Sequence, residues 1–367
     1  MAPLPLPAGI RSRRVAGVNG LDVHLLEAGD AGRPALLLLH GFPELAYSWR
    51  KVMLPLAQAG YHVIAPDQRG YGQTTGWDGR YDGDLGSYRL TNLVKDQREL
   101  LQRLRLESVA AVIGHDFGSP VAAWCALLHP ELFRSLVLMS APFAGPPAAP
   151  VAPPDPVHDE LAKLPRPRKH YQWYYSTREA DADMLRCPQG VHAFLRAYYH
   201  MKSADWKDNH PRELAAWSAA ELAKMPTYYI MDLGENMAQT VAPHLPEAPA
   251  DWLTDDELRV YSDAFARTGF QAALQWYRCR TSGKFNDDLC VHHGRKVAVP
   301  ACFIAGKSDW GPYQRPGDLA RMRASAFADD RGCHFVEGAG HWVQQEQPGD
   351  TARLVRRFLA EVQDREA

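Results

Sequence analysis

Residues 109–119 read V-A-A-V-I-G-H-D-F-G-S, and this stretch decides the fold. Val109–Ile113 is an apolar run rich in β-branched residues, and it is long enough for a buried strand. Two glycines stand two positions before and after Asp116, where glycine lets the backbones of a strand and a helix approach closely. Residues 119–124, S-P-V-A-A-W, are typical of a helix start with a serine cap and proline in the first turn. The stretch predicts a strand, a sharp turn with Asp116 at its apex, and a helix.

The residue at the apex of this turn indicates the chemistry. A strand, a turn with flanking glycines and a helix form the context of a nucleophile elbow. The central residue here is Asp116 rather than serine or cysteine. A carboxylate attacks carbon and forms an alkyl ester, so it suits epoxides and alkyl halides better than ordinary esters. The alternative is a glycine-rich turn with an incidental aspartate, because short glycine motifs are common.

Short apolar runs alternate with helical patterns around this stretch. The turn dipeptide Asn19-Gly20 predicts a hairpin within residues 15–27. Up to about residue 144, the alternation of strands and helices implies a mostly parallel, doubly wound sheet. The strands are predicted at 35–39, 61–65 and 132–139, and an amphipathic helix is predicted at 91–104.

The composition changes after residue 144. Eight prolines lie between residues 146 and 167, and this density predicts a linker or a long surface loop. Residues 170–290 have a mostly helical pattern, and the strand–helix pattern returns at 297–305. We therefore predict an α/β fold with an inserted helical segment, divided into an N-terminal tail (1–14), a core (15–144 and 294–367) and a helical cap with a proline-rich entry loop (145–293).

Composition and charge exclude several classes of function. The chain has 367 residues, with 41 lysine and arginine residues against 43 aspartate and glutamate residues, and its formal net charge is −2. This balance gives no electrostatic basis for nucleic-acid binding. No apolar run reaches the roughly 18 residues needed to span a bilayer, and the N-terminus lacks the apolar segment of a secretion signal. The six cysteines show no C-x-x-C spacing, so we expect reduced thiols, a cytoplasmic location and no metal site.

Two further residues complete a catalytic pattern with Asp116. Asp309 follows the strand that resumes the pattern, and His341 follows a short strand at 333–336 that comes after a helix across 316–327. Taken singly, an aspartate after a strand is usually a helix cap, and a histidine after glycine is usually a loop residue. The order nucleophile, acid, histidine is that of α/β-hydrolases, and the chain has no G-x-S-x-G motif. The three residues therefore predict a catalytic triad at the carboxyl edge of one sheet.

Four motifs beyond the N-terminal tail match those of a known family. They are H-G-F-P at 40–43, G-H-D-F-G-S at 114–119, the loop of Asp309, and G-H-W-V-Q-Q-E-Q-P at 340–348. On these motifs the chain resembles the soluble epoxide hydrolases of the α/β-hydrolase fold. The first two motifs are shared with haloalkane and haloacetate dehalogenases, so they leave the substrate open.

Two tyrosine motifs in the predicted cap separate epoxides from halides. Y-Q-W-Y at 171–174 resembles the Tyr-Gln-x-Tyr motif of the family, and W-Y-R at 276–278 resembles its Trp-Tyr-Arg motif. The resemblance assigns Tyr171 and Tyr277 to the epoxide oxygen. A phenol can donate a hydrogen bond and then a proton to a developing alkoxide. The alternative for each tyrosine is an aromatic core residue with a solvated hydroxyl.

The resemblance implies a cofactor-independent hydrolysis of an apolar epoxide to a vicinal diol in two steps. Asp116 attacks an epoxide carbon, and His341, oriented by Asp309, then activates the water that attacks the ester. Backbone N–H groups of Phe42 and Phe117 stabilise the oxyanion. His341 must be neutral in the second step, so hydrolysis is expected to fade at acid pH.

The substrate pocket is expected to include Trp173, Trp342 and Pro43. Phe117 occupies a position that is often tryptophan in this family, which changes the shape of the pocket. We expect a monomer or a homodimer whose partners are a small epoxide and water. Two other functions remain open, namely a dehalogenase with the same triad and a non-catalytic small-molecule receptor on the same fold. The intact acid–base set argues against the receptor, because a binder needs no histidine to activate water.

Overall fold

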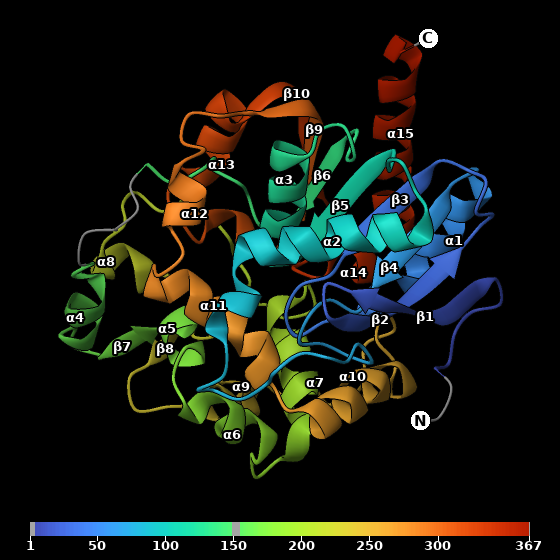
Figure 1. The fold of residues 1–367 in the computed structure, drawn as a ribbon. Helices are drawn as coiled ribbons and strands as arrows, with labels where there is room; N and C mark the ends of the chain where they lie inside the picture. Colours follow the sequence, from blue (N-terminus) through green and yellow to red (C-terminus); the bar gives the residue numbers. More distant parts are fainter. Residues whose placement is uncertain (1–3, 149–154, 367) are drawn as a thin grey trace.

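The computed structural model describes residues 4–148 and 155–366, so residues 149–154 of the proline-rich stretch lie outside it. Its centre is an eight-stranded sheet with the order β1-β2-β4-β3-β5-β6-β9-β10 (Figure 1). β2 is antiparallel to β1 and β4, and all other neighbouring strands are parallel. The strands are β1 (Ile10–Val18), β2 (Leu21–Ala28), β3 (Ala35–Leu39), β4 (His62–Pro66), β5 (Ala111–His115), β6 (Leu136–Met139), β9 (Val297–Gly306) and β10 (Phe327–Val336).

The parallel strands bring their carboxyl ends to one edge of the sheet. The last residue of β3, Leu39, pairs with Gly114 of β5, and His115 pairs with Met139 of β6. At the far side, Val336 at the end of β10 pairs with the last residue of β9. The loops after β5, β9 and β10, which carry the predicted triad, therefore leave the sheet at the same edge.

Helices cover both faces of this sheet and explain why β3, with the sequence A-L-L-L-L, is buried along its whole length. Leu36 and Leu38 pack with α1 and α15, whereas Leu37 and Leu39 pack with α2 and α3 on the opposite face. The helical elements around the sheet are η1 (Ala46–Trp49), α1 (Arg50–Gln58), η2 (Leu85–Tyr88), α2 (Leu90–Leu104), α3 (Gly118–Leu128), η4 (Gly311–Tyr313), α13 (Asp318–Arg321), η5 (Met322–Ala326), α14 (Val343–Glu346) and α15 (Pro348–Glu366).

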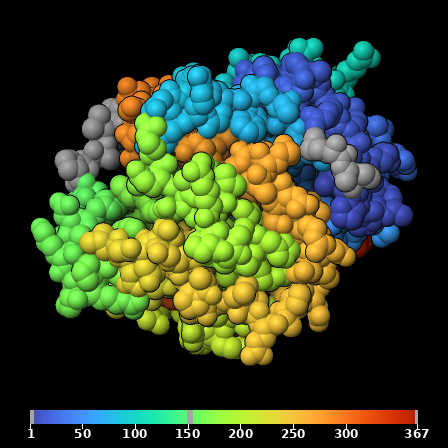
Figure 2. Space-filling view, turned by 90° about the horizontal axis from the view of Figure 1, so that it is seen from below, coloured from blue at the N-terminus to red at the C-terminus, as the bar shows by residue number. Residues whose placement is uncertain are grey.

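The segment between β6 and β9 folds mostly into helices, most of which lie in the lower half of Figure 1 and cover the face seen in Figure 2. It also contains a small antiparallel pair, β7 with β8, that the sequence patterns did not predict. Its elements are α4 (Val157–Ala162), β7 (Arg168–His170), α5 (Tyr171–Tyr175), α6 (Glu179–Leu185), α7 (Gly190–Lys202), α8 (Ala219–Leu222), β8 (Ile230–Asp232), α9 (Met237–Val241), η3 (Ala242–His244), α10 (Asp255–Thr268), α11 (Gln271–Ser282) and α12 (Asp287–Cys290).

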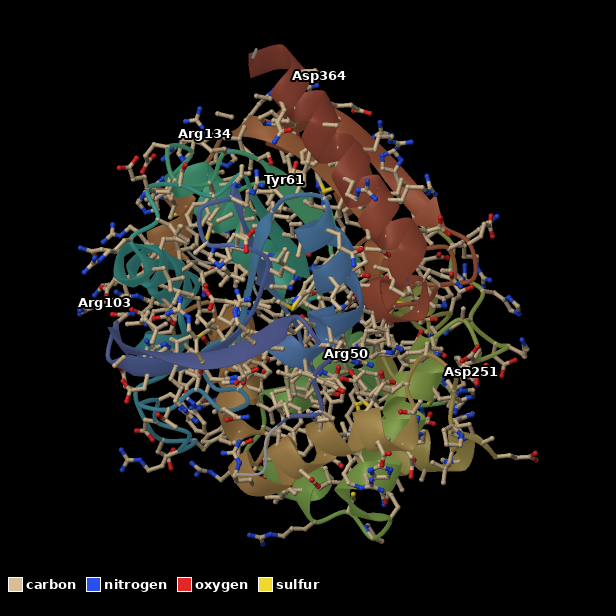
Figure 3. All side chains as sticks on the ribbon, turned by 90° about the vertical axis from the view of Figure 1, so that its right-hand side faces the viewer. Arg50, Tyr61, Arg103, Arg134, Asp251 and Asp364 are labelled. Carbon is tan, nitrogen blue, oxygen red and sulfur yellow. The ribbon has the colours of Figure 1, made fainter. Side chains whose placement is uncertain are left out.

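A buried arginine ties this segment to the sheet. Figure 3 shows charged side chains at the periphery of the molecule, for example Asp251 and Asp364. Arg50, in contrast, is only 2% exposed. Its guanidinium donates to the side chain of Gln345 on α14 at 2.9 Å and to Glu257 on α10 at 3.0 Å. The guanidinium therefore has one partner beside the sheet, on α14, and one in the inserted segment, on α10. These two contacts fix α10 against the core.

The structure corrects several predicted boundaries. β1 begins at Ile10, so residues 10–14 belong to the sheet and not to a tail, and Arg13 pairs with Glu27 of β2 at 2.6 Å. β10 begins at Phe327, although a helix was predicted across 316–327 and a strand only at 333–336. Within the proline-rich stretch, the proline-free run that starts at Val157 is long enough for α4. The division into core and cap at 145–293 stays a prediction.

Candidate active site

Asp116 stands at the apex of a tight turn between β5 and α3. Its φ of 51° lies in the left-handed region, which is strained for a residue with a side chain. A Cβ on Gly114 would lie 2.2 Å from the carbonyl oxygen of Gly118, and one on Gly118 would lie 2.2 Å from that of Leu39. Only glycine fits at either position, as the sequence pattern predicted. The two glycines therefore let the turn close and present the Asp116 side chain at the sheet edge.

The Asp116 carboxylate is held by one backbone donor and faces one histidine. Phe42 donates its N–H to Oδ1 at 2.9 Å, and Nε2 of His341 lies 3.2 Å from Oδ2. Burial alone raises the pKa of the Asp116 carboxyl, but His341 and the positive charge of Lys202 outweigh it and hold the pKa well below its usual range. The side chain is therefore a carboxylate at neutral pH, as a nucleophile requires.

Asp309 and His341 complete the triad from the loops after β9 and β10. Nδ1 of His341 donates to Oδ1 of Asp309 at 3.0 Å, and the N–H of Gly311 donates to the same oxygen at 2.7 Å. Burial raises the pKa of Asp309, but the charge and hydrogen bond of His341 lower it by more than burial raises it. The pKa of Asp309 therefore lies below its ordinary value. Within the described part of the chain, Nε2 of His341 has no hydrogen-bond partner. That nitrogen is free to take a proton.

A second buried pair, which the sequence analysis missed, supports the loop of His341. Glu44 and His115 are both fully buried, and Nδ1 of His115 lies 2.5 Å from a carboxylate oxygen of Glu44. The other nitrogen of His115 donates to the backbone carbonyl of His341 at 2.7 Å. Burial lowers the pKa of His115, but the Glu44 carboxylate raises it above its ordinary value. His115 lies in one quoted motif and Glu44 directly follows another, yet only the fold reveals that their side chains meet.

The two predicted tyrosines face the triad from α5 and α11. Their ring centroids lie 6.0 Å apart, and both line the same cavity as Asp116. The Tyr171 hydroxyl donates to Gln314 at 2.9 Å and accepts from Gln172 at 3.1 Å. Burial and the negative charge of Asp116 raise the pKa of both phenols above the ordinary value, so each keeps its proton. The pair can act as hydrogen-bond and proton donors.

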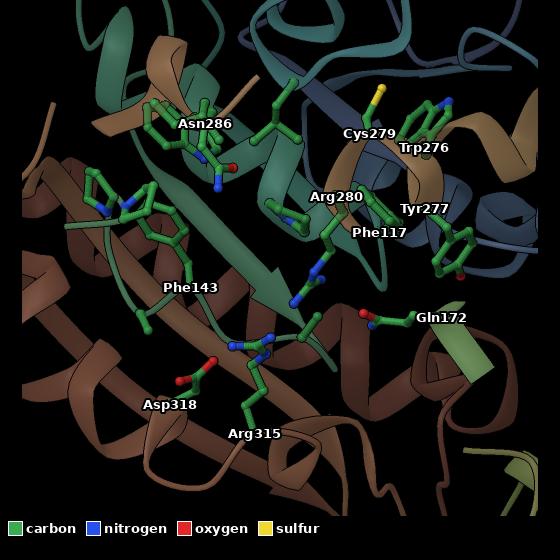
Figure 4. A pocket seen from close by; sticks show the side chains of 18 of the residues that line it. Phe117, Phe143, Gln172, Trp276, Tyr277, Cys279, Arg280, Asn286, Arg315 and Asp318 are labelled. Carbon is green, nitrogen blue, oxygen red and sulfur yellow. The ribbon is translucent and has the colours of Figure 1, made fainter. Parts of the chain in front are cut away.

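A cavity of about 700 Å³ joins these groups (Figure 4). Its inner wall is formed by Asp116 and by apolar or aromatic side chains, which include Phe117, Trp124, Phe143, Trp276 and Tyr277. Figure 4 places Tyr277 and Gln172 on one side and Phe143 on the other. A site of this size and lining suits a mainly apolar small molecule.

The three predicted pocket residues do not line this cavity. Trp342 is fully buried and donates its indole N–H to the carbonyl of Tyr199 at 2.9 Å. Trp173 packs on the ring of His158 at a centroid distance of 3.6 Å. The carbonyl of Pro43 accepts the Tyr199 hydroxyl at 3.1 Å. The prediction for these residues is wrong for the cavity beside Asp116, because Trp342 and Pro43 contact Tyr199 of α7 and Trp173 packs within the segment between β6 and β9.

Lys202 is a further residue that the sequence patterns did not single out. It is 3% exposed, and its ammonium lies 5.0 Å from the ring centroid of Tyr229 and 5.4 Å from that of Trp342. Burial lowers the pKa of Lys202, while the carboxylates of Asp116 and Asp309 oppose that shift. The lysine places a positive charge near the triad and favours an ionised Asp116.

Sequence and fold both match one family. Residues 34–222 match the family described as the alpha/beta hydrolase fold. Epoxide hydrolase A of Mycobacterium tuberculosis is 31% identical over 302 residues, which cover 82% of this chain and 83% of that protein. The chain belongs to the epoxide hydrolases of the α/β-hydrolase family. This epoxide hydrolase is also 32% identical to epoxide hydrolase B of the same species over 342 residues, 88% of this chain and 91% of the other.

A solved structure extends this similarity to the whole fold. An epoxide hydrolase from an endophytic Streptomyces has a TM-score of 0.79 and 30% identity, over 98% of this chain and 97% of that one. No helix within residues 4–148 and 155–366 has the length and apolarity to cross a bilayer. In the same ranges, no group of three or more His, Cys, Asp and Glu side chains is arranged to hold a metal ion.

Proposed function

We propose that this epoxide hydrolase opens its substrate through a covalent alkyl ester on Asp116 and releases a vicinal diol. The observation that carries the proposal is the arrangement around the carboxylate. Oδ1 accepts the N–H of Phe42, and the carboxylate lines a cavity into which two protonated tyrosines also face. The carboxylate at the apex of the turn can reach a substrate carbon itself, and the two phenols can donate to the oxygen that leaves the ring.

In the first half-reaction, Oδ2 of Asp116 attacks an epoxide carbon. The carbon–oxygen bond of the ring breaks as the new ester bond forms, and the oxygen takes a proton from a tyrosine. Tyr277 is the better placed donor, because no described residue accepts its hydroxyl, whereas the Tyr171 hydroxyl already donates to Gln314. Tyr171 can then turn its proton towards the oxygen as the second donor.

In the second half-reaction, water attacks the carboxyl carbon of Asp116 and gives a proton to Nε2 of His341. Asp309 orients the imidazole and stabilises the imidazolium. Oδ1 becomes the oxyanion at the N–H of Phe42, and Phe117 supplies a second N–H at the positive end of α3. The tetrahedral intermediate then breaks down: the bond between its carboxyl carbon and Oδ2 breaks, and the diol leaves as an alkoxide that carries Oδ2. His341 gives its proton to this alkoxide. The remaining proton restores the tyrosine hydroxyl.

Replacing His341 by glutamine separates the two halves. We expect His341→Gln to react once with an epoxide and to accumulate an adduct on the peptide that contains Asp116, which mass spectrometry detects. The double variant His341→Gln, Asp116→Asn is the control and gives no adduct. A His341→Gln enzyme that turns over at the wild-type rate without an adduct would contradict the proposed roles.

The dehalogenase alternative uses the same triad, so a substrate test separates it. An alkyl halide of similar size is offered in parallel with the epoxide, and halide release is measured against diol formation. We expect diol and only background halide, because the two phenols are donors for an oxygen that becomes an alcohol. Bound but unreacted epoxide would instead favour the receptor.

A further inference from the structure

Gln314 connects the loop of the triad acid to a tyrosine of the cap. It follows the short turn η4, and the first residue of that turn, Gly311, donates its N–H to Oδ1 of Asp309 at 2.7 Å. The Gln314 side chain lines the cavity, where its Oε1 accepts the Tyr171 hydroxyl at 2.9 Å. One turn of the core therefore carries both the acid of the triad and an acceptor for a proton donor of the cap.

The hydroxyl of Tyr171 is fully engaged by its neighbours. Its proton goes to Gln314, and its oxygen accepts Nε2 of Gln172 at 3.1 Å. Tyr171 is only 4% exposed, and hydrogen bonds in such a place are electrostatically stronger than in water. Burial and the charge of Asp116 raise the pKa of this phenol, so the proton stays on its oxygen. To donate to an epoxide oxygen, Tyr171 must first give up its bond to Gln314.

The hydroxyl of Tyr277 is not engaged in this way. Tyr277 lines the same cavity, and its ring centroid lies 6.0 Å from that of Tyr171. The ring packs against aromatic side chains, at centroid distances of 5.2 Å to Phe117 and 5.6 Å to Phe42. Within the described part of the chain, no group is placed to accept its proton. The two phenols therefore differ in that only Tyr171 has a competing acceptor.

We propose that Gln314 is a positioning residue that restrains the proton of Tyr171, so that Tyr277 is the main acid in ring opening. This role rests on the proposed function of Asp116 and the two tyrosines. As Oδ2 of Asp116 forms its bond to carbon, the carbon–oxygen bond of the ring breaks and the oxygen takes the proton of Tyr277. The Tyr171 hydroxyl assists only to the extent that it leaves Gln314. A core loop thus sets the relative contributions of two donors that stand on the cap.

Gln314→Met tests this role, because methionine has nearly the length of glutamine but lacks the amide oxygen. Rapid quench measures ester formation on Asp116 in wild type, Tyr171→Phe and Tyr277→Phe, each with and without the change at Gln314. A neutral hydrogen bond is worth up to about tenfold in an equilibrium. We therefore expect Gln314→Met to speed ring opening about three- to tenfold in Tyr277→Phe, where Tyr171 is the remaining phenol donor. In Tyr171→Phe, Gln314→Met should have no effect.

Gln314→Glu is the matched control, because glutamate keeps both the length of the side chain and an acceptor for the Tyr171 proton. We expect no acceleration by Gln314→Glu in Tyr277→Phe. Acceleration by both changes, or by Gln314→Met in Tyr171→Phe as well, would show an effect of cavity shape and overturn the role. Slower ring opening in Gln314→Met wherever Tyr171 is present would show that the amide assists this donor, and would overturn it too. So would an unchanged rate in every background.

The same experiment separates this role from the ester mechanism. If the ester forms on Asp116 but the effect of Gln314→Met does not depend on Tyr171, the role of Gln314 is refuted and the proposed function stands. If the diol appears without an ester, the proposed function fails. The variants are then compared by single-turnover diol formation, in which the same dependence on Tyr171 supports the role of Gln314 and its absence refutes it.

Discussion

The core and the cap hold their functional groups by different means. In the core, Asp116, Asp309 and His341 follow the ends of strands that pair in fixed register, and backbone N–H groups and buried charges fix each side chain. In the cap, Tyr171 and Tyr277 stand on helices within a cluster of aromatic rings, with few polar contacts. The core therefore fixes direction and charge, whereas the cap supplies donors and the shape of the cavity.

This difference assigns the two layers to different half-reactions. In the proposed mechanism, the triad takes part in both forming and hydrolysing the ester, since Asp116 attacks the epoxide and His341 activates the water. The tyrosines of that mechanism contact only the oxygen that leaves the ring, so they matter only until the ester has formed. Variants in the two layers should therefore affect different kinetic steps.

The largest expected effect follows from removing the core carboxylate that orients His341. Asp309→Asn keeps the shape of the side chain but loses the charge that holds the imidazole in the right tautomer. We expect ester hydrolysis to slow by roughly 10³–10⁴-fold, as loss of this charge does in other triads, while ring opening slows much less. Rapid-quench measurement of ester and diol separates the two steps. Equal slowing of both steps would remove the distinction between the layers.

The cap tyrosines should show the opposite pattern. Removing one positioned donor costs about 10²-fold in rate, so Tyr277→Phe should slow ring opening by that factor and Tyr171→Phe by less, because Tyr171 already donates to Gln314. The double variant should nearly abolish ring opening. Tyr175→Phe is the matched control, since Tyr175 packs 5.1 Å from Tyr277 but does not line the cavity. Ring opening at the wild-type rate in the double variant would make both tyrosines packing residues.

The same difference explains what the sequence could predict. Strand ends, glycine spacing and motif order identified the elbow, Asp309 and His341, because each depends on local backbone geometry. The Glu44–His115 pair and Lys202 depend on side chains brought together by the fold, and nothing in their local pattern marks them. The predicted pocket failed for a related reason, because an aromatic residue looks the same in a sequence whether it lines a cavity or packs.

The loss of protein stability in acid should also differ between the core and the cap, with a smaller effect than the changes in rate above. Asp67 is buried beside His24 at 2.7 Å, and although burial raises its pKa, the histidine and backbone donors lower it to about 2. Because the pKa of Asp67 is lower in the folded state than the unfolded value of 3.8, the carboxylate stabilises the fold at pH values above 3.8. This stability is lost as the pH falls towards 2. The difference between the unfolded and the folded pKa of Asp67 corresponds to about 2 kcal/mol in the free energy of unfolding.

Thermal unfolding between pH 4 and pH 2 measures this contribution. We expect the melting temperature of wild type to fall over that range and Asp67→Asn to flatten the fall. Asp232 of the cap is more accessible and pairs with Arg166 and Arg168, so Asp232→Asn should change the slope of melting temperature against pH less than Asp67→Asn. If the melting temperature depended on pH in the same way in both variants, the carboxylates of the core and the cap would stabilise the fold equally.

The most direct test of the central claim is the origin of the oxygen in the first diol formed. Excess enzyme is allowed one turnover in ¹⁸O-labelled water, and the diol and the peptide that contains Asp116 are analysed by mass spectrometry. Covalent catalysis predicts an unlabelled diol and one labelled oxygen in the Asp116 carboxyl group, because water attacks the ester carbon and Oδ2 leaves with the product. A labelled diol from that first turnover, with an unlabelled Asp116, would contradict the ester and make Asp116 a base that activates water.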